Sequence, residues 1–199
     1  MMNAHRPNPH ALATVRHAAA RGFTLIELLV VLTLLGVMLM LAAPSFLTFQ
    51  RNAELTSAAN SFMAALSAAR AEAMKRQLRT FVVPASANNW ATGWQVFVDV
   101  DSNVTAGSVS AGTGDLVVAE PVGLPTTIGI SSNTFGDGTT TYVMFNGSGF
   151  MTLIDKTFQT GSLELSNGTS SENRRVIVNP TGRMRVCKSS ETGCAAGDF

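Results

Sequence analysis

The sequence predicts an α+β fold in which a long N-terminal helix packs on an antiparallel β-sheet head. An apolar run begins at Phe23, and its one charged side chain before Arg51 is Glu27. An amphipathic pattern with helical spacing follows over about 51–77. After Arg79 the chain changes to short β-rich runs separated by Gly, Ser, Thr and Asn. The 199 residues suffice for one domain plus a targeting and membrane segment.

Residues 1–22 read as a polar, basic leader that contains Pro7 and Pro9. In an ordinary secretory signal the apolar region precedes the cleavage site. Here the apolar run follows Gly22, so that cleavage after the leader would leave the apolar stem attached. The alternative is a plain signal anchor, which leaves the Gly22–Phe23 junction and Glu27 unexplained.

The stem from 23 to 43 is predicted to cross a membrane, because its 21 residues make roughly 31 Å of helix. Arg16 and Arg21 favour a cytoplasmic N-terminal end by the positive-inside rule. A carboxylate inside such a stem costs about 2.5–3.5 kcal/mol on insertion scales. We therefore expect Glu27 to meet a partner chain.

The amphipathic half of the helix is predicted to cover the head. Pro44 removes one backbone hydrogen bond and favours a kink. A coiled-coil seam is the alternative, but the many alanines and the short repeat favour packing on a sheet. The whole helix is expected over 23–78. The apolar stripe, with spacings of three and four, consists of Leu55, Ala59, Phe62, Leu66, Ala69 and Ala73.

The head, residues 79–199, is predicted to form antiparallel sheets, because its strands are close together and joined by hairpin-type links. The stretches 102–114, 131–141 and 166–173 are expected to be loops. The expected strands are Thr80–Val83, Gly93–Val98, Leu116–Glu120, Thr126–Ile130, Thr141–Phe145, Phe150–Ile154, Ser162–Leu165, Arg174–Val178 and Arg183–Cys187.

Composition excludes several functions for a chain cut after Gly22. The leader carries all three histidines, so the remainder could form neither a Ser/His/Asp triad nor a histidine metal site. Loss of the three leader arginines leaves 11 basic and 13 acidic side chains, a net charge of −2, so nucleic-acid binding would need a local patch. Cys187 and Cys194 are more typical of a disulfide than of a redox or zinc site in an exported protein.

Arginines cluster around a predicted turn near the C-terminus, Asn179-Pro180-Thr181-Gly182. This turn would pair Val178 with Arg183 and Val176 with Arg185. The predicted hairpin then places Arg174, Arg183 and Arg185 on one face, with Lys188 just beyond, and Ile177, Met184 and Val186 on the other. Such a face could bind phosphate groups without reading sequence, or it could be a solvated hairpin held by salt bridges.

Two further motifs favour structural roles. The segment Asp99–Asn103 supplies the first three oxygen ligands of a calcium loop, but it lacks the required glycine and glutamate further on, so a surface turn is favoured. Asp99 and Asp101 are adjacent outward positions and do not form an acid/base cleft. Trp90 and Trp94 are interpreted as a hydrophobic brace rather than a ligand platform. We expect no catalytic residue, metal or cofactor.

The segment Gly22-Phe23-Thr24-Leu25-Ile26-Glu27 resembles the type III signal of type IV prepilins and type II secretion pseudopilins. The resemblance implies that a prepilin peptidase cuts between Gly22 and Phe23 and methylates the new Phe23 amine. It also implies that Glu27 neutralises that amine, in its own or in the adjacent subunit, during filament assembly.

Three further segments resemble the FimT/GspH family of minor pilins and pseudopilins: Ala69–Arg76, Trp90–Asp99 and Gly182–Cys187. The resemblance implies a pilin-like fold, an inner-membrane anchor with a periplasmic head, and other pilins as partners. Its Gly-Arg-x-Arg turn implies binding of double-stranded DNA through Arg183 and Arg185, helped by Arg174 and Lys188. We expect a minor type IV pilin active in natural transformation, the alternative being a minor pseudopilin of type II secretion.

Overall fold

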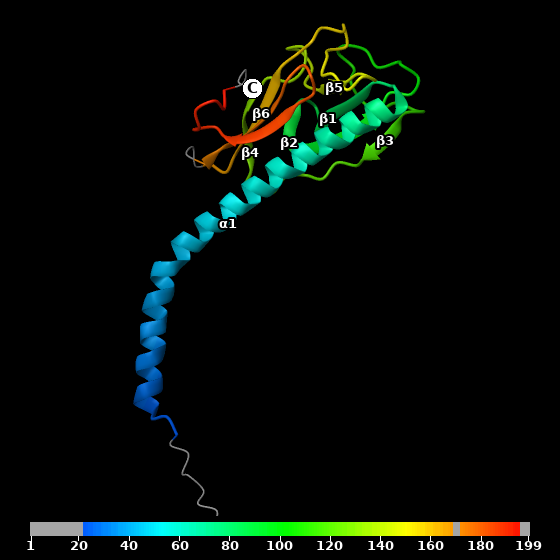
Figure 1. Cartoon of the computed structure of the whole chain (residues 1–199). Helices are drawn as coiled ribbons and strands as arrows, with labels where there is room; N and C mark the ends of the chain where they lie inside the picture. Colours follow the sequence, from blue (N-terminus) through cyan, green and yellow to red (C-terminus); the bar gives the residue numbers. More distant parts are fainter. Residues whose placement is uncertain (1–21, 169–171, 196–199) are drawn as a thin grey trace, which may run out of the picture. The chain divides into compact units, whose positions relative to one another are not determined.

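The computed structural model describes residues 22–168 and 172–195 (Figure 1). The predictions for the three leader arginines and the three histidines concern residues outside this part. The chain divides into two compact units, 1–44 and 45–199. The elements are α1 (Leu25–Arg76), β1 (Thr80–Ser86), β2 (Asn89–Val98), β3 (Leu116–Ala119), β4 (Gly129–Asn133), β5 (Val143–Phe145), β6 (Gly161–Ser166), β7 (Arg174–Val178) and β8 (Met184–Lys188).

The first unit contains the apolar part of α1. Thr24 caps the helix, because its Oγ1 accepts a hydrogen bond from the Glu27 amide at 3.3 Å. Phe23 therefore lies just before the helix, and its side chain is 83% exposed. The 18 residues Leu25–Ala42 have a mean hydropathy of 2.7, and none of this segment is buried. By length and composition it could cross a membrane.

In the second unit, the remainder of α1 lies across both sheets (Figure 1). All six residues of the predicted apolar stripe are fully buried, which confirms the helical spacing. Phe62 of this stripe packs edge-on against Trp90 and Trp94, with ring centroids 5.3 and 4.9 Å away. The two tryptophans therefore belong to the core, as the brace interpretation expected.

The head consists of two four-stranded antiparallel sheets, with strand orders β3-β2-β1-β5 and β4-β6-β7-β8. One core cluster joins α1 to both sheets through residues such as Val82 and Val176. A second, smaller cluster around Phe81 and Phe97 fills the other face of the first sheet. This arrangement confirms the predicted α+β architecture.

Most predicted strands overlap the observed strands with shifted ends, and two differ more strongly. Phe150–Ile154 is not a strand, because the amides of Met151 and Thr152 bond to different partners, Pro180 O and Met144 O. Only isolated bridges form there. The strand predicted over Thr126–Ile130 begins later, at Gly129, because the Ile128 amide donates to Pro125 O at 2.9 Å and closes a turn. β4 also extends to Asn133, so the stretch 131–141 is not wholly a loop as predicted.

Candidate functional site

The turn between β7 and β8 is held by its own polar groups. The Gly182 amide donates to Asn179 O at 2.9 Å, and the Asn179 amide donates to Arg183 O at 3.0 Å. Asn179 Oδ1 also accepts hydrogen bonds from the Arg183 amide at 2.9 Å and from Thr181 Oγ1 at 2.8 Å. Arg183 is therefore part of the turn and not the first residue of the strand.

The hairpin register is shifted by one residue from the predicted one. Val178 pairs with Met184, Val176 with Val186, and Arg174 with Lys188. The predicted pairs of Val178 with Arg183 and Val176 with Arg185 are wrong. A one-residue change in register moves a strand's side chains to the opposite face.

The inner face of the hairpin, which packs on α1, therefore carries a different set of residues from the predicted set. Val176 and Val178 are fully buried there, in the cluster that contains α1. The outer face carries Arg175, Ile177, Arg185 and Cys187. Arg174 lies on the inner face, whereas Arg185 lies on the outer face. The prediction that Arg174, Arg183 and Arg185 share one face is therefore wrong. Met184 and Val186 likewise share the inner face and not a face with Ile177.

At the edge of the inner face, Arg174 and Lys188 share one carboxylate. Arg174 Nη1 donates to Glu172 O at 2.9 Å and lies 3.7 Å from Glu172 Oε2. Lys188 Nζ lies 3.4 Å from the same oxygen. Both cations are thus partly neutralised by an ion pair within the head.

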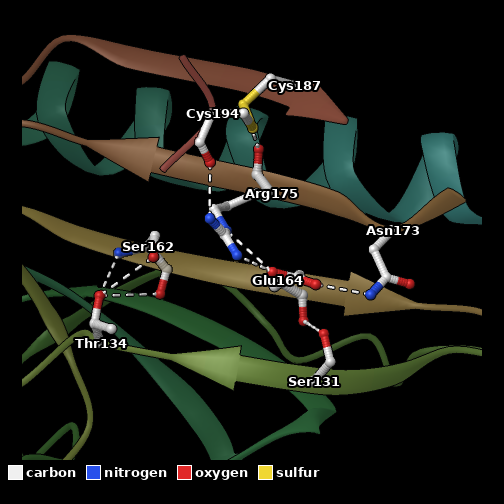
Figure 2. Close-up of polar contacts among 8 residues, drawn as sticks. All are labelled: Ser131, Thr134, Ser162, Glu164, Asn173, Arg175, Cys187 and Cys194. Carbon is white, nitrogen blue, oxygen red and sulfur yellow. Dashed lines mark hydrogen bonds and ion pairs between the residues drawn. A yellow bond between two sulfur atoms is a disulfide. The ribbon is translucent and has the colours of Figure 1, made fainter. Parts of the chain in front are cut away.

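On the outer face, Arg175 is the centre of a polar network (Figure 2). Its Nε donates to Glu164 Oε2 at 3.0 Å, its Nη2 pairs with the same oxygen, and its Nη1 donates to Cys194 O at 2.7 Å. Asn173 Nδ2 donates to Glu164 Oε1 at 2.7 Å. Burial raises the pKa of Glu164, but the hydrogen bonds from Asn173 and Arg175 outweigh it and hold the pKa below its usual value.

Arg185 lies on the same outer face and contacts the C-terminal loop. Its Nη2 donates to Gly193 O. Cys187 and Cys194 form a disulfide that closes this loop, with their Cα atoms 6.0 Å apart. Arg185 and Arg175 are therefore both bonded to carbonyl oxygens of one short segment.

Arg183 differs from the other arginines of the hairpin, because its side chain is exposed. It makes no hydrogen bond or ion pair through its guanidinium group to the residues that the structure describes. It borders a groove of about 320 Å³ between the turn and α1. The other lining residues are Met63, Ser67, Arg70, Ala71, Met74, Gly182 and Met184.

Arg70 brings a second cation to this groove, which the sequence analysis did not identify. Its Nε donates to Gly149 O at 2.9 Å and its Nη2 to Thr181 O at 3.2 Å, so it ties two turns of the head to α1. Gly182, with φ of +75°, leaves no room for a side chain, because a Cβ would lie 2.5 Å from Arg70 Nε. The helical spacing could have indicated that Arg70 faces the head, because it is four residues after Leu66 and borders the apolar stripe.

The acidic loop after β2 brings together Asp99, Asp101 and Asp115, with carboxylate oxygens within 4.8 Å of one another. Each of these carboxylates already accepts a hydrogen bond or forms an ion pair within the head. Asp99 is buried and paired with Arg79, Asp101 accepts from the Asn103 side chain at 2.6 Å, and Asp115 accepts from backbone amides. The loop is thus held by its own hydrogen bonds, and Asp115 is a member that the motif did not reveal. The buried Asp99 is not the outward position that the sequence predicted.

A family model described as "Type II transport protein GspH" matches residues 58–182, and one described as "Prokaryotic N-terminal methylation motif" matches residues 18–43. No curated protein matches the chain.

Three solved structures resemble the chain. The type IV minor pilin FimU of Pseudomonas aeruginosa matches with a TM-score of 0.51 and 19% identity, over 73% of this chain and 98% of that chain. A second crystal form of FimU gives a TM-score of 0.47 and 19% identity, over 70% and 99%. The minor pseudopilin EpsH from the Type 2 Secretion System of Vibrio cholerae gives 0.46 and 14%, over 69% and 99%.

An apolar N-terminal helix and an amphipathic continuation packed on two antiparallel sheets define a pilin-like protein, and the match to FimU supports this fold. The GspH family model covers more than half of the chain, and the methylation motif precedes it. The chain therefore belongs to the GspH family of minor pilins and pseudopilins, as the sequence resemblance predicted.

Proposed function

We propose that the protein is a minor type IV pilin, a structural component of a pilus, which holds double-stranded DNA for uptake in natural transformation. The observation that carries the DNA contact is the exposed guanidinium group of Arg183, at a rigid turn beside Arg70. Contact would be with the phosphate backbone, without sequence preference. The role is structural, and it requires no catalytic group, metal or cofactor.

The N-terminal part of the proposal concerns processing and assembly. A prepilin peptidase would cut between Gly22 and Phe23 and methylate the Phe23 amine. The stem would remain in the bacterial inner membrane with the head in the periplasm, until the subunit joins other pilins in a pilus. Glu27 would neutralise a Phe23 amine in the filament. The methylation-motif match and the position of Phe23 just outside the Thr24-capped helix support this order of events.

The structure favours Arg183 as the first phosphate contact among the four candidate cations. Arg174 and Lys188 are paired with Glu172, and Arg185 donates to Gly193 O. A phosphate would have to compete with these partners, whereas at Arg183 it would meet an exposed guanidinium group. Charge-assisted bonds from arginine to phosphate are among the stronger hydrogen bonds.

Binding of a mixed-sequence DNA duplex tests the DNA contact. The full chain in neutral detergent micelles would be measured at several salt concentrations, with Arg183→Gln and, as a matched control, Arg174→Gln. Loss of one phosphate contact should lower the salt slope by about 1 in Arg183→Gln. Arg174→Gln should keep the wild-type slope. An unchanged slope in Arg183→Gln would contradict the proposal.

A second candidate is a minor pseudopilin of a type II secretion system. The description of the matching family model, a type II transport protein, favours it. Deletion of the gene in the source bacterium separates the two candidates. Loss of transformation, restored by the wild-type gene but not by Arg183→Gln, would support the pilus. Loss of protein secretion with normal transformation would support the pseudopilin.

A further inference from the structure

The C-terminal loop 188–193 is attached to the outer face of the hairpin at a few points. The disulfide joins the two residues that flank it, Cys187 and Cys194, and the Ser189 amide donates to Asn173 O at 3.0 Å. Residues 190–193 are otherwise exposed, whereas Cys194 is 2% exposed. Figure 2 shows Cys194 O directed at Arg175, beside the disulfide.

The loop carbonyls occupy donors that a phosphate could use. Gly193 O accepts from Arg185, and Cys194 O accepts from Arg175. Peptide oxygens carry only partial charge, so a phosphate oxygen is the stronger partner for a guanidinium group. The carbonyls belong to the segment that the Cys187–Cys194 bridge closes, so the bridge limits how far they can move from the hairpin.

The two arginines depend on the loop to different extents. Arg175 also bonds to Glu164 through Nε and Nη2, and this pair lies within the sheet between β6 and β7. It would remain after the loop detached. The contact of Arg185 with Gly193 O, by contrast, requires the loop to stay in place. Arg185 is two residues from Arg183 in the sequence, and a DNA backbone held by Arg183 would extend from the turn to it.

We propose that the Cys187–Cys194 disulfide controls how many phosphates the hairpin binds. With the bridge intact, the loop covers Arg185 and Arg183 contacts DNA alone. Reduction by a dithiol transfers two electrons, and with two protons the disulfide becomes two thiols, while the dithiol becomes a disulfide. The loop then detaches, and Arg185 joins Arg183 on the DNA backbone. This inference rests on the DNA-binding function proposed above.

The reduction is chemically accessible in this structure. Cys187 is only partly buried, whereas Cys194 is 2% exposed, so a dithiol would approach the bridge from the Cys187 side. The chain contains two cysteines, both in this bridge, so that a dithiol changes no other disulfide in it. The effect of reduction can therefore be assigned to this loop.

The test compares oxidised and dithiothreitol-reduced full chain in neutral detergent micelles, binding a mixed-sequence DNA duplex at several salt concentrations. Reduction should make the salt slope steeper by about 1 and tighten binding roughly five- to tenfold near 0.1 M salt. The gain should vanish in reduced Arg185→Gln and persist in reduced Arg174→Gln. Cys187→Ser/Cys194→Ser should bind like the reduced wild type.

Hydrogen exchange provides a measurement that does not depend on DNA. Reduction should speed exchange of the Ser189 and Cys194 amides, while β6 and β7 keep their protection. Equal slopes in both redox states, with binding still lowered by Arg183→Gln, would overturn the redox control and leave the proposed function intact. Absence of binding in both states would overturn both. Unchanged exchange in the loop would also overturn the redox control.

Discussion

Arginines on the two faces of the β7–β8 hairpin have different partners. On the inner face, Arg174 lies at the edge of an apolar surface and pairs with Glu172. On the outer face, Arg175 lies between a carboxylate and a carbonyl oxygen. Only Arg183, in the turn, leaves its guanidinium group exposed among these three. The number of arginines is therefore a poor guide to phosphate binding, because the strand register determines which arginines already have partners within the head.

The stability of the protein should be most sensitive to loss of side-chain volume on the inner face of this sheet, which packs on α1. Leu163 of β6 is fully buried in the cluster that includes α1. Leu163→Ala should lower the free energy of unfolding by about 2–5 kcal/mol, because it removes buried methyl groups and leaves a cavity. Urea denaturation of the detergent-solubilised chain measures this. A loss below about 1 kcal/mol would show that the helix does not pack tightly on this face.

On the outer face, the largest effect should come from breaking the Arg175–Glu164 pair. Arg175→Met leaves a largely buried carboxylate without its cation, which should cost about 2–4 kcal/mol in unfolding free energy. The double variant Arg175→Met/Glu164→Gln should recover part of this loss, because no charge is left unpaired. Equal stabilities of single and double variants in urea denaturation would contradict the pairing.

The stability of the turn between β7 and β8 should be sensitive to the addition of a single methyl group. Gly182 has φ of +75°, and a Cβ there would lie 2.3 Å from Gly149 O. Gly182→Ala should therefore cost about 1–3 kcal/mol in unfolding free energy, since the backbone strain cannot be relieved by the neighbouring turn. Gly138→Ala is a suitable control: its φ is also positive, at +87°, but it has no atom within 4 Å of the added Cβ.

The smallest effect should be the pH dependence of the outer face. The pKa of Glu164 is lowered in the folded state, so its contribution to stability is present above its ordinary value of 4.5 and is lost as the pH falls through the folded pKa. Wild type should thus lose more stability below pH 4.5 than Glu164→Gln. Unfolding midpoints between pH 3 and 7 measure this. Parallel pH profiles would contradict the assignment.

The helix and most strands could be predicted because their signals are local. The stripe from Leu55 to Ala73 depends only on helical periodicity, and it is buried as expected. The hairpin register was missed because it depends on one side-chain hydrogen bond within the turn, which no residue periodicity reveals. Asn179 Oδ1 accepts from the Arg183 amide and draws Arg183 into the turn, which lengthens the turn by one residue and reverses the faces.

The arginine partners could not be predicted for a different reason. The oxygens that occupy Arg175 and Arg185 belong to β6 and to the C-terminal loop, and their positions depend on the sheet order and on the disulfide. Arg70 is separated from the turn by 111 positions in the sequence, yet its Nη2 donates to Thr181 O. Contacts at this range follow from tertiary structure and leave no short sequence pattern.

The most direct test of the central claim is a map of where DNA touches the head. Amide and arginine side-chain NMR signals of the oxidised, ¹⁵N-labelled chain in detergent micelles would be followed during addition of a DNA duplex. We predict that the largest shifts occur at Thr181, Gly182, Arg183 and the Arg70 side chain. Shifts centred on Arg174 and Lys188, with the turn unchanged, would contradict the account.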